Sequence, residues 1–160
     1  MRRLALAASL LLGLSSPVLA DPIIFQGGAF DGLRAESLPT GGWRFMPGVA
    51  APSPVAAPKR AAIATLTDRL RRGGRLGRIS LAPIALDSLS GAALEREFRR
   101  VIATCPSDPP YALDEGKVRI TWLCDGHPTW LGIFVFSGNV VQRIQFGRAE
   151  VAVVEAPARR

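Results

Sequence analysis

The chain has 160 residues, of which 20 are basic and 13 acidic, so its formal net charge is +7. This length is typical of a single domain. The single histidine, without a cluster of carboxylates at ligand spacing, does not build a zinc site, so we expect no metal and no cofactor.

Residues 1–20 are predicted to be a secretory signal peptide. An arginine pair begins the segment, Leu4 to Leu14 form an apolar stretch, and aliphatic or small residues precede Asp21. An uncleaved membrane anchor is the alternative, but the apolar stretch falls short of the roughly 20 residues that span a bilayer. Cleavage after Ala20 leaves 140 residues with 18 basic and 13 acidic side chains, a net charge of +5. We expect a periplasmic or secreted protein with no transmembrane span in the mature chain.

Residues 21–58 have the composition of a tail or linker, with six glycines and six prolines in 38 residues. No helix or strand period is evident there. The segment also contains four aromatic residues, Phe25, Phe30, Trp43 and Phe45, which a solvated linker does not need. They either pack on the outside of the following domain or dock on a partner. We favour packing, because exposed aromatic residues lower solubility.

A helix is predicted from Lys59 to Arg72, where apolar residues recur at helical spacing and Gly73-Gly74 supplies the helix end. The apolar run from Leu76 to Leu86 contains Pro83, which favours an edge strand or an extended segment.

A second helix is predicted from Ser90 to Cys105. Ser90 is placed to cap it, and Leu89 to pack against Leu94. One face is apolar, and Glu95 and Arg99 form an exposed pair four residues apart. The apolar face consists of Leu94, Phe98, Val101 and Ile102.

Three strands follow the helices. Residues 117–124 alternate, with Trp122 and Cys124 on one face and Arg119 and Thr121 on the other. Residues 130–136 are apolar on both faces, which is typical of a central strand covered on each side. Ser137-Gly138-Asn139 predicts a tight turn before a strand at 140–146.

Cys105 and Cys124 are predicted to form a disulfide, because the chain carries two cysteines and is expected to be exported. A redox pair is the alternative, but such pairs usually have Cys-x-x-Cys spacing. The predicted fold is α+β: one or two helices packed on a three- to four-stranded antiparallel β-meander, with the disulfide joining helix to sheet. The predicted domain spans residues 59–155.

No catalytic residue is predicted. His127 lies in a turn beside Asp125, and its only nearby thiol is Cys124, which we expect to be oxidised. The acidic pairs Asp114-Glu115 and Glu95-Glu97 identify no cleft by themselves. No phosphate-binding glycine motif follows a strand.

A basic stretch near the end of the first helix is the best candidate for a binding site. Its guanidinium groups could hold phosphates on lipid headgroups or another acidic polymer. The alternative is a solvated helix end in which cations favour the helix dipole. The stretch consists of Arg69, Arg71, Arg72, Arg75 and Arg78.

We therefore expect an exported, non-catalytic envelope protein that acts as a binding or accessory module. Its partner would be an envelope protein or an anionic envelope polymer, and export disfavours nucleic acid. A small periplasmic enzyme or enzyme inhibitor is the alternative. The order of elements from Lys59 to Phe146 resembles the SmpA/OmlA outer-membrane lipoproteins, which assist β-barrel assembly. No motif matches, and Asp21 stands where those proteins carry a lipidated cysteine.

Overall fold

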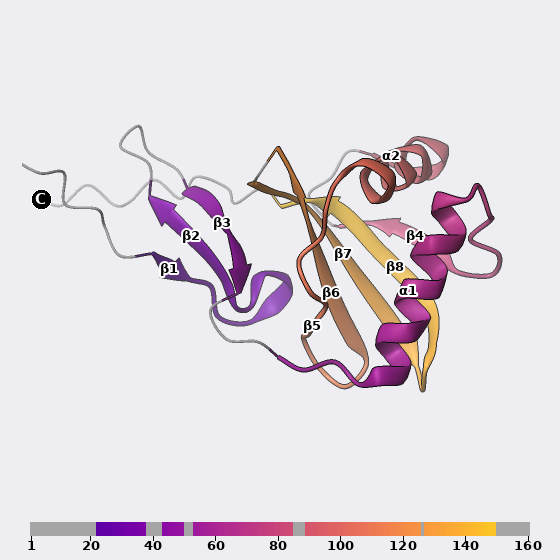
Figure 1. The fold of residues 1–160 in the computed structure, drawn as a ribbon, viewed down its shortest axis with the longest axis horizontal. Helices are drawn as coiled ribbons and strands as arrows, with labels where there is room; N and C mark the ends of the chain where they lie inside the picture. The colour runs from indigo at the N-terminus through magenta and orange to yellow at the C-terminus, as the bar shows by residue number, and fades with distance from the viewer. Residues whose placement is uncertain (1–21, 38–42, 50–52, 85–88, 126, 150–160) are drawn as a thin grey trace, which may run out of the picture.

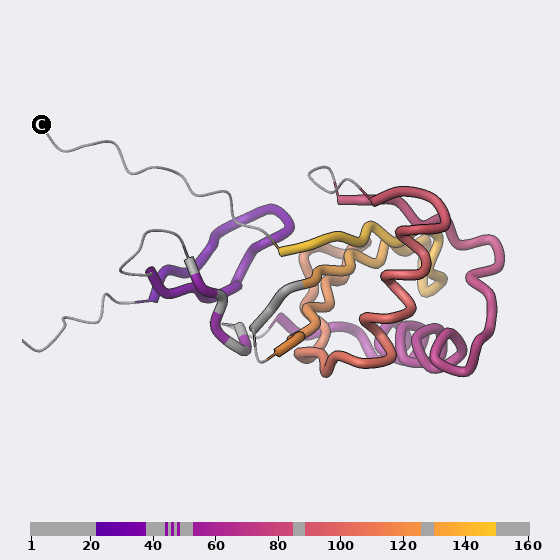
Figure 2. Tube along the Cα trace, turned by 90° about the horizontal axis from the view of Figure 1, so that it is seen from above, coloured from indigo at the N-terminus to yellow at the C-terminus, as the bar shows by residue number. Residues whose placement is uncertain are grey.

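The computed structural model describes residues 22–37, 43–49, 53–84, 89–125 and 127–149. The predicted signal peptide lies outside the described residues. The described segments form three layers: a small sheet, a five-stranded sheet and a layer of two helices on its far side (Figures 1 and 2). The elements in chain order are β1 (Ile23–Ile24), a 3₁₀ turn (Gly28–Phe30), β2 (Leu33–Ser37), β3 (Trp43–Val49), α1 (Ala57–Arg71), β4 (Ser80–Pro83), α2 (Gly91–Thr104), β5 (Tyr111–Ala112), β6 (Lys117–Cys124), β7 (His127–Ser137) and β8 (Val140–Arg148).

The central sheet has the strand order β4-β8-β7-β6-β5. Strands β5 to β8 pair antiparallel, as the predicted meander requires, but β4 pairs parallel with β8, with Ser80 opposite Arg143. The sheet is therefore mixed, and the prediction of a purely antiparallel meander of three or four strands is wrong. Strand β4 lies at the sheet edge, where Pro83 removes no hydrogen bond from an interior ladder, as predicted for this segment.

Strand β7 occupies the centre of this sheet and is buried on both faces, as its sequence predicted. Phe134 on the helix-facing side and Leu131 on the opposite side are both fully buried. The turn at Gly138 joins β7 to β8 with a φ of 58°, which glycine adopts at low cost. A strand covered on both sides implies that each face of the sheet carries a second layer.

Helix α1 begins two residues before its predicted start and ends at the predicted glycines. Gly73 has a φ of 80°, and its N–H donates to the carbonyl of Leu70, while the Gly74 N–H donates to the carbonyl of Arg69. These two bonds form a Schellman motif, which closes the helix. At Gly74 a Cβ atom would lie 2.5 Å from Cγ of Arg69, so the stem of that arginine passes directly over the glycine.

Helix α2 buries the predicted apolar face against the central sheet. Its ion pair joins Arg99 Nη2 to Glu95 Oε1 at 2.7 Å, and Arg99 Nη1 also donates to the carbonyl of Gly74. Ser90 stands at the N-cap but makes no side-chain capping bond, so that part of the prediction is wrong. The buried residues of α2 are Leu94, Phe98, Val101 and Ile102.

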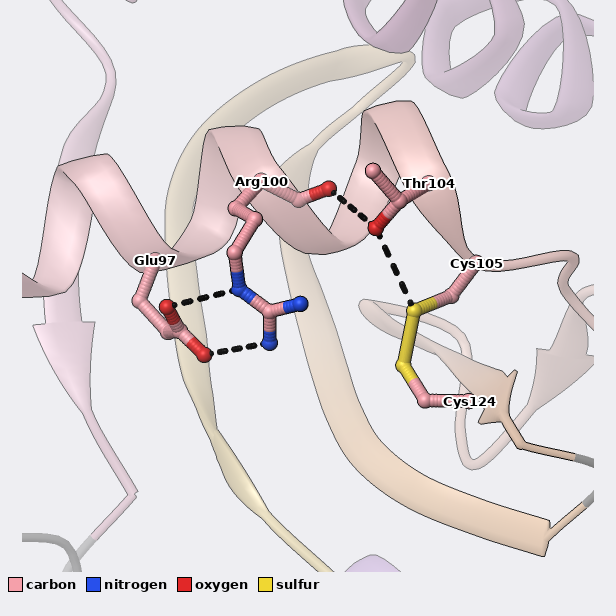
Figure 3. Close-up of a disulfide and its surroundings, with 5 residues drawn as sticks. All are labelled: Glu97, Arg100, Thr104, Cys105 and Cys124. Carbon is pink, nitrogen blue, oxygen red and sulfur yellow. Dashed lines mark hydrogen bonds and ion pairs between the residues drawn. A yellow bond between two sulfur atoms is a disulfide. The ribbon is translucent and has the colours of Figure 1, made fainter.

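The disulfide between Cys105 and Cys124 is confirmed, with an S–S distance of 2.01 Å. It joins the end of α2 to the end of β6, so it links the helix layer to the sheet as predicted (Figure 3). Thr104 lies beside it, with its hydroxyl 3.6 Å from Cys105 Sγ. A covalent link of this kind stabilises mainly by restricting the unfolded chain.

The main core lies between the helices and the central sheet and is built around aromatic rings. Phe98 from α2 contacts Phe146 and Trp122, with ring centroids 4.9 and 6.0 Å apart, and Trp130 stacks on Phe146 at 4.9 Å. Gly132 makes room for this cluster, because a Cβ there would lie 2.7 Å from the Trp122 ring.

Within the segment predicted to be a glycine- and proline-rich tail or linker, three strands form an antiparallel sheet, β1-β2-β3. Leu33 and Ala35 from β2 are fully buried against Leu131, and Phe25 and Phe30 pack on the same cluster. For those two aromatic residues, the structure shows the predicted packing on the domain. The side chains of Trp43 and Phe45 lie outside the described ones.

The proline-rich stretch before α1 is also in contact with the domain. Val55 is 6% exposed and belongs to the main core, and the carbonyl of Ser53 accepts a hydrogen bond from Ala112 N. This stretch was expected to be a linker. In the structure it packs instead along the end of the central sheet.

A close contact fixes how the small sheet meets the central one. Gly32 precedes β2 with a φ of 73°, and a Cβ at that position would lie 2.8 Å from the hydroxyl of Tyr111 in β5. Only glycine allows the tyrosine ring to approach the backbone this closely.

Replacing Gly32 by alanine should therefore destabilise the fold more than the same change at Gly77. Gly77 has a similar φ of 70°, but no heavy atom lies within 4 Å of a Cβ placed there. Both variants carry the left-handed backbone strain, and only Gly32→Ala displaces Tyr111, which should add about 1–3 kcal/mol. Urea unfolding of the two variants measures this difference, and equal losses of unfolding free energy would contradict the contact.

Candidate functional site

The most unusual group in the structure is Arg119, which lies in β6 and is 1% exposed. Its Nη1 donates to the main-chain carbonyls of Ala29, at 3.0 Å, and Asp31. The guanidinium carbon also lies 4.6 Å from the centre of the Tyr111 ring. The connection between β1 and β2 thus lies against a buried cation of the central sheet and supplies its hydrogen-bond acceptors.

The carboxylate of Asp31 joins this cluster. It accepts the Tyr111 hydroxyl at 2.8 Å and the N–H of Gly27 at 2.7 Å. These bonds stabilise the ionised form, so they hold the pKa of Asp31 below its ordinary value. We call the four residues Arg119, Tyr111, Asp31 and Asp108 the interlayer cluster.

Asp108 is the fourth member of the interlayer cluster and is 9% exposed. Its Oδ2 accepts the N–H of Gly48 in β3, and its own N–H donates to the carbonyl of Thr121 in β6. Burial raises the pKa of Asp108, while the bond from Gly48 and the charge of Arg119 act in the opposite direction. Asp108 therefore links β3 of the small sheet to β6 of the central one.

A cluster of buried ionisable groups is where an active site would be sought. Here each member bonds across the two sheets, and Asp108 lines neither the cavity nor the groove described below. The interlayer cluster accordingly fits a role in joining layers. Within the described part of the chain, Nε and Nη2 of Arg119 are buried without a hydrogen-bond partner.

The predicted basic stretch separates into two groups in the structure. Arg71 Nε donates to the carbonyl of Ile102 at 2.8 Å, near the end of α2, and Arg72 forms an ion pair with Asp68 one turn earlier in α1. Both are therefore engaged within the fold. The other three, Arg69, Arg75 and Arg78, are exposed, and none forms an ion pair with a described residue.

A shallow groove of about 300 Å³ lies beside Arg69, between α1 and the start of β8. Its lining is largely apolar and includes Leu66, Ile79 and Val141. A groove of this size is at the small end of the range for ligand sites.

A larger, open cavity of about 790 Å³ lies at the other end of α1. The stretch from Ser53 to Ala56 forms one wall and the turn from β5 to β6 another. Lys59 donates to the main-chain carbonyl of Glu115, and its Nζ lies 5.6 Å from the centre of the Phe136 ring. Asp114, also in the lining, is bound by Lys117 at 3.1 Å.

The remaining candidates from the sequence lie in three different places. Cys124 is oxidised, and His127 is the first residue of β7 with a side chain outside the described ones. Glu95 and Glu97 pair with arginines of their own helix. In the segments that the structure describes, no three His, Cys, Asp or Glu side chains group as a metal site would require. The described helices are also too short or too polar to cross a membrane.

Comparison with known proteins assigns no family to this chain: neither a scan against models of protein families nor a search of curated proteins finds a significant match.

The only tyrosine of the chain reports directly on the interlayer cluster. Burial raises the pKa of Tyr111 above its ordinary value of 10.0, and the hydrogen bond to Asp31 raises it further. The fold therefore favours the neutral phenol of Tyr111 over its phenolate. The stability that the fold gains from this preference is complete below pH 10.0 and is lost as the pH rises through the raised pKa.

Asp31→Asn should lower the pKa of Tyr111 while leaving it above 10.0, because burial remains when the carboxylate charge is removed. Ultraviolet absorbance of the phenolate, followed during an alkaline titration, measures this shift without interference from a second tyrosine. Asp68→Asn, on the exposed face of α1, is the control and should leave the midpoint unchanged. An unchanged midpoint in Asp31→Asn would show that the two groups do not interact.

Proposed function

We propose that this protein is an exported, non-catalytic binding module of the cell envelope that recognises an anionic ligand. Its binding surface is the C-terminal end of α1 and the loop that follows, where Arg69, Arg75 and Arg78 lie exposed. The observation that carries the proposal is the difference between these three arginines and Arg71 and Arg72, which the fold uses. Guanidinium groups that pair with no described carboxylate are available to bind phosphate or carboxylate in two-point geometry.

Arg69 lies in the last turn of α1, and the loop that carries Arg75 and Arg78 is held in place from both helices. Its start is fixed by the Schellman motif at Gly73, and Arg99 of α2 donates to the carbonyl of Gly74 at 2.8 Å. Leu76, in the middle of the loop, is buried in the main core. The exposed guanidinium groups therefore project from an ordered backbone, which reduces the entropy lost on binding.

Export to the periplasm or beyond, with cleavage after Ala20, is part of the same proposal. The disulfide between Cys105 and Cys124 supports it, because such bonds form and persist in oxidising compartments. An enzyme remains the alternative, and a carboxyl group of raised pKa in an open cavity would favour it. Among the described residues, Asp108 has the raised pKa, but it lines neither the cavity nor the groove.

The exported, oxidised protein should bind vesicles that contain phosphatidylglycerol and should not bind vesicles of phosphatidylcholine. Changing Arg69, Arg75 and Arg78 together to glutamine should weaken that binding on the order of a hundredfold, since each arginine near an anionic surface contributes about 1 kcal/mol. Cosedimentation at low and at physiological salt measures the effect, and added salt should weaken binding by screening.

The matched control removes the same charge from other elements, through Arg34, Arg44 and Arg143 changed to glutamine. The first two lie in β2 and β3, and the third is exposed on β8. The control variant should keep most of the affinity. Equal losses in both variants would show that net charge alone drives binding, and absence of binding by the unaltered protein would contradict the proposal.

A further inference from the structure

The groove beside Arg69 is built from one stripe of α1 and the strand beside it. Ala62, Thr65, Leu66 and Arg69 follow the helical spacing that places residues on one face. Across from them lie Ile79 and residues 139–141, at the beginning of β8. The groove therefore runs along α1 toward the basic end of the helix.

The floor and rim of this groove are apolar. Leu66 and Val141 are buried beneath it, Ala62 and Ile79 are half-buried, and Val140 at its edge is 61% exposed. Val140 has the highest exposure of any large apolar side chain among the described residues. Apolar surface left open to water favours an apolar occupant.

Among the described residues that line the groove, Arg69 is the only ionisable one. The other polar residues of that lining, Thr65 and Asn139, are neutral. The stem of Arg69 is confined by the backbone at Gly74, where a Cβ would lie 2.5 Å from its Cγ. The neighbouring carboxylate, Asp68, is paired with Arg72. The groove thus combines an apolar trough with a single positioned cation.

We infer that this groove binds the acyl chain of an anionic lipid, with Arg69 holding the phosphate or carboxylate of its head. A chain with one charged end matches this lining, because the trough removes methylene groups from water at about 0.8 kcal/mol each while Arg69 forms a charge-assisted pair. An acidic peptide fits the lining less well, because its polar backbone groups would find only two neutral polar side chains among the described lining residues, Thr65 and Asn139. The inference rests on the proposed function and identifies the ligand class of the same surface.

The experiment uses the exported, oxidised protein and titrates decyl phosphate below its micellar concentration in a calorimeter. Decanoate carries the same kind of chain with a carboxylate head, so it distinguishes the two possible heads. Inorganic phosphate tests the head alone, and decyl maltoside tests a chain with a neutral head. We expect saturable, single-site binding of at least one of the two anionic chains, and no comparable binding of phosphate or the maltoside.

Two pairs of variants locate the site. Ala62→Phe fills the groove, whereas Ala64→Phe places the same ring on an exposed position of α1 outside its lining. Arg69→Gln removes the cation, whereas Arg60→Gln removes an exposed cation elsewhere on the helix. Ala62→Phe and Arg69→Gln should each weaken binding about tenfold or more, and the two controls should not. Arg69 is exposed, so its variant remains informative if the larger ring perturbs folding.

Several outcomes would overturn the inference. One is that inorganic phosphate or decyl maltoside binds as tightly as decyl phosphate. Another is that neither Ala62→Phe nor Arg69→Gln changes the affinity for the anionic chains. Binding of an acidic apolar peptide, or self-association that Ala62→Phe abolishes, would assign the groove to another occupant if neither anionic chain binds. Vesicle binding that depends on the three arginines, without binding of single chains, would remove this inference and leave the proposed function intact. Absence of both vesicle binding and single-chain binding would contradict this inference and the proposed function together.

Discussion

The contact between the buried guanidinium of Arg119 and the main chain that connects β1 to β2 governs the layering of this molecule. A buried cation needs hydrogen-bond acceptors, and the carbonyl oxygens of Ala29 and Asp31 both accept from Nη1 of Arg119. Tyr111 covers the guanidinium from a third direction. The second layer over β7 therefore depends on polar pairing as well as on the apolar contacts of Leu33 and Leu131.

The small sheet covers one face of the central sheet, so the proposed ligand-binding surface lies on the side of the helices. The proline-rich stretch that follows β3 passes the end of the sheet, where Val55 enters the core, before α1 begins. On the helix side, Arg71 and Arg99 tie the end of α1 to α2, and the disulfide ties α2 to β6. The exposed arginines and the groove thus lie on a part of the fold where both helices are linked to each other and to the sheet.

The sequence was sufficient where the signal is local. Helix periodicity, the glycine pair after Arg72 and the pairing of two cysteines each predicted what the structure contains. Long-range pairing was not predictable: nothing in residues 76–86 shows that β4 runs parallel to β8. The sequence indicated the small sheet only indirectly. A strand that is apolar on both faces needs a packed layer on each side, and the aromatic segment at 25–45 could supply one of these layers. In the basic stretch, helical spacing could not show that Arg71 reaches Ile102, 31 residues away.

The role of Arg119 is tested most directly by hydrogen exchange of backbone amides in Arg119→Met, which keeps an apolar stem and removes the donors. The account predicts that amides of β2 exchange faster by on the order of tenfold or more, because two hydrogen bonds from a charged donor are lost. Protection in α2 and in β6 to β8 should change little, since the aromatic core and the disulfide remain. Unchanged protection of β2, or an equal loss in every element, would contradict the claim that this guanidinium holds the small sheet in place.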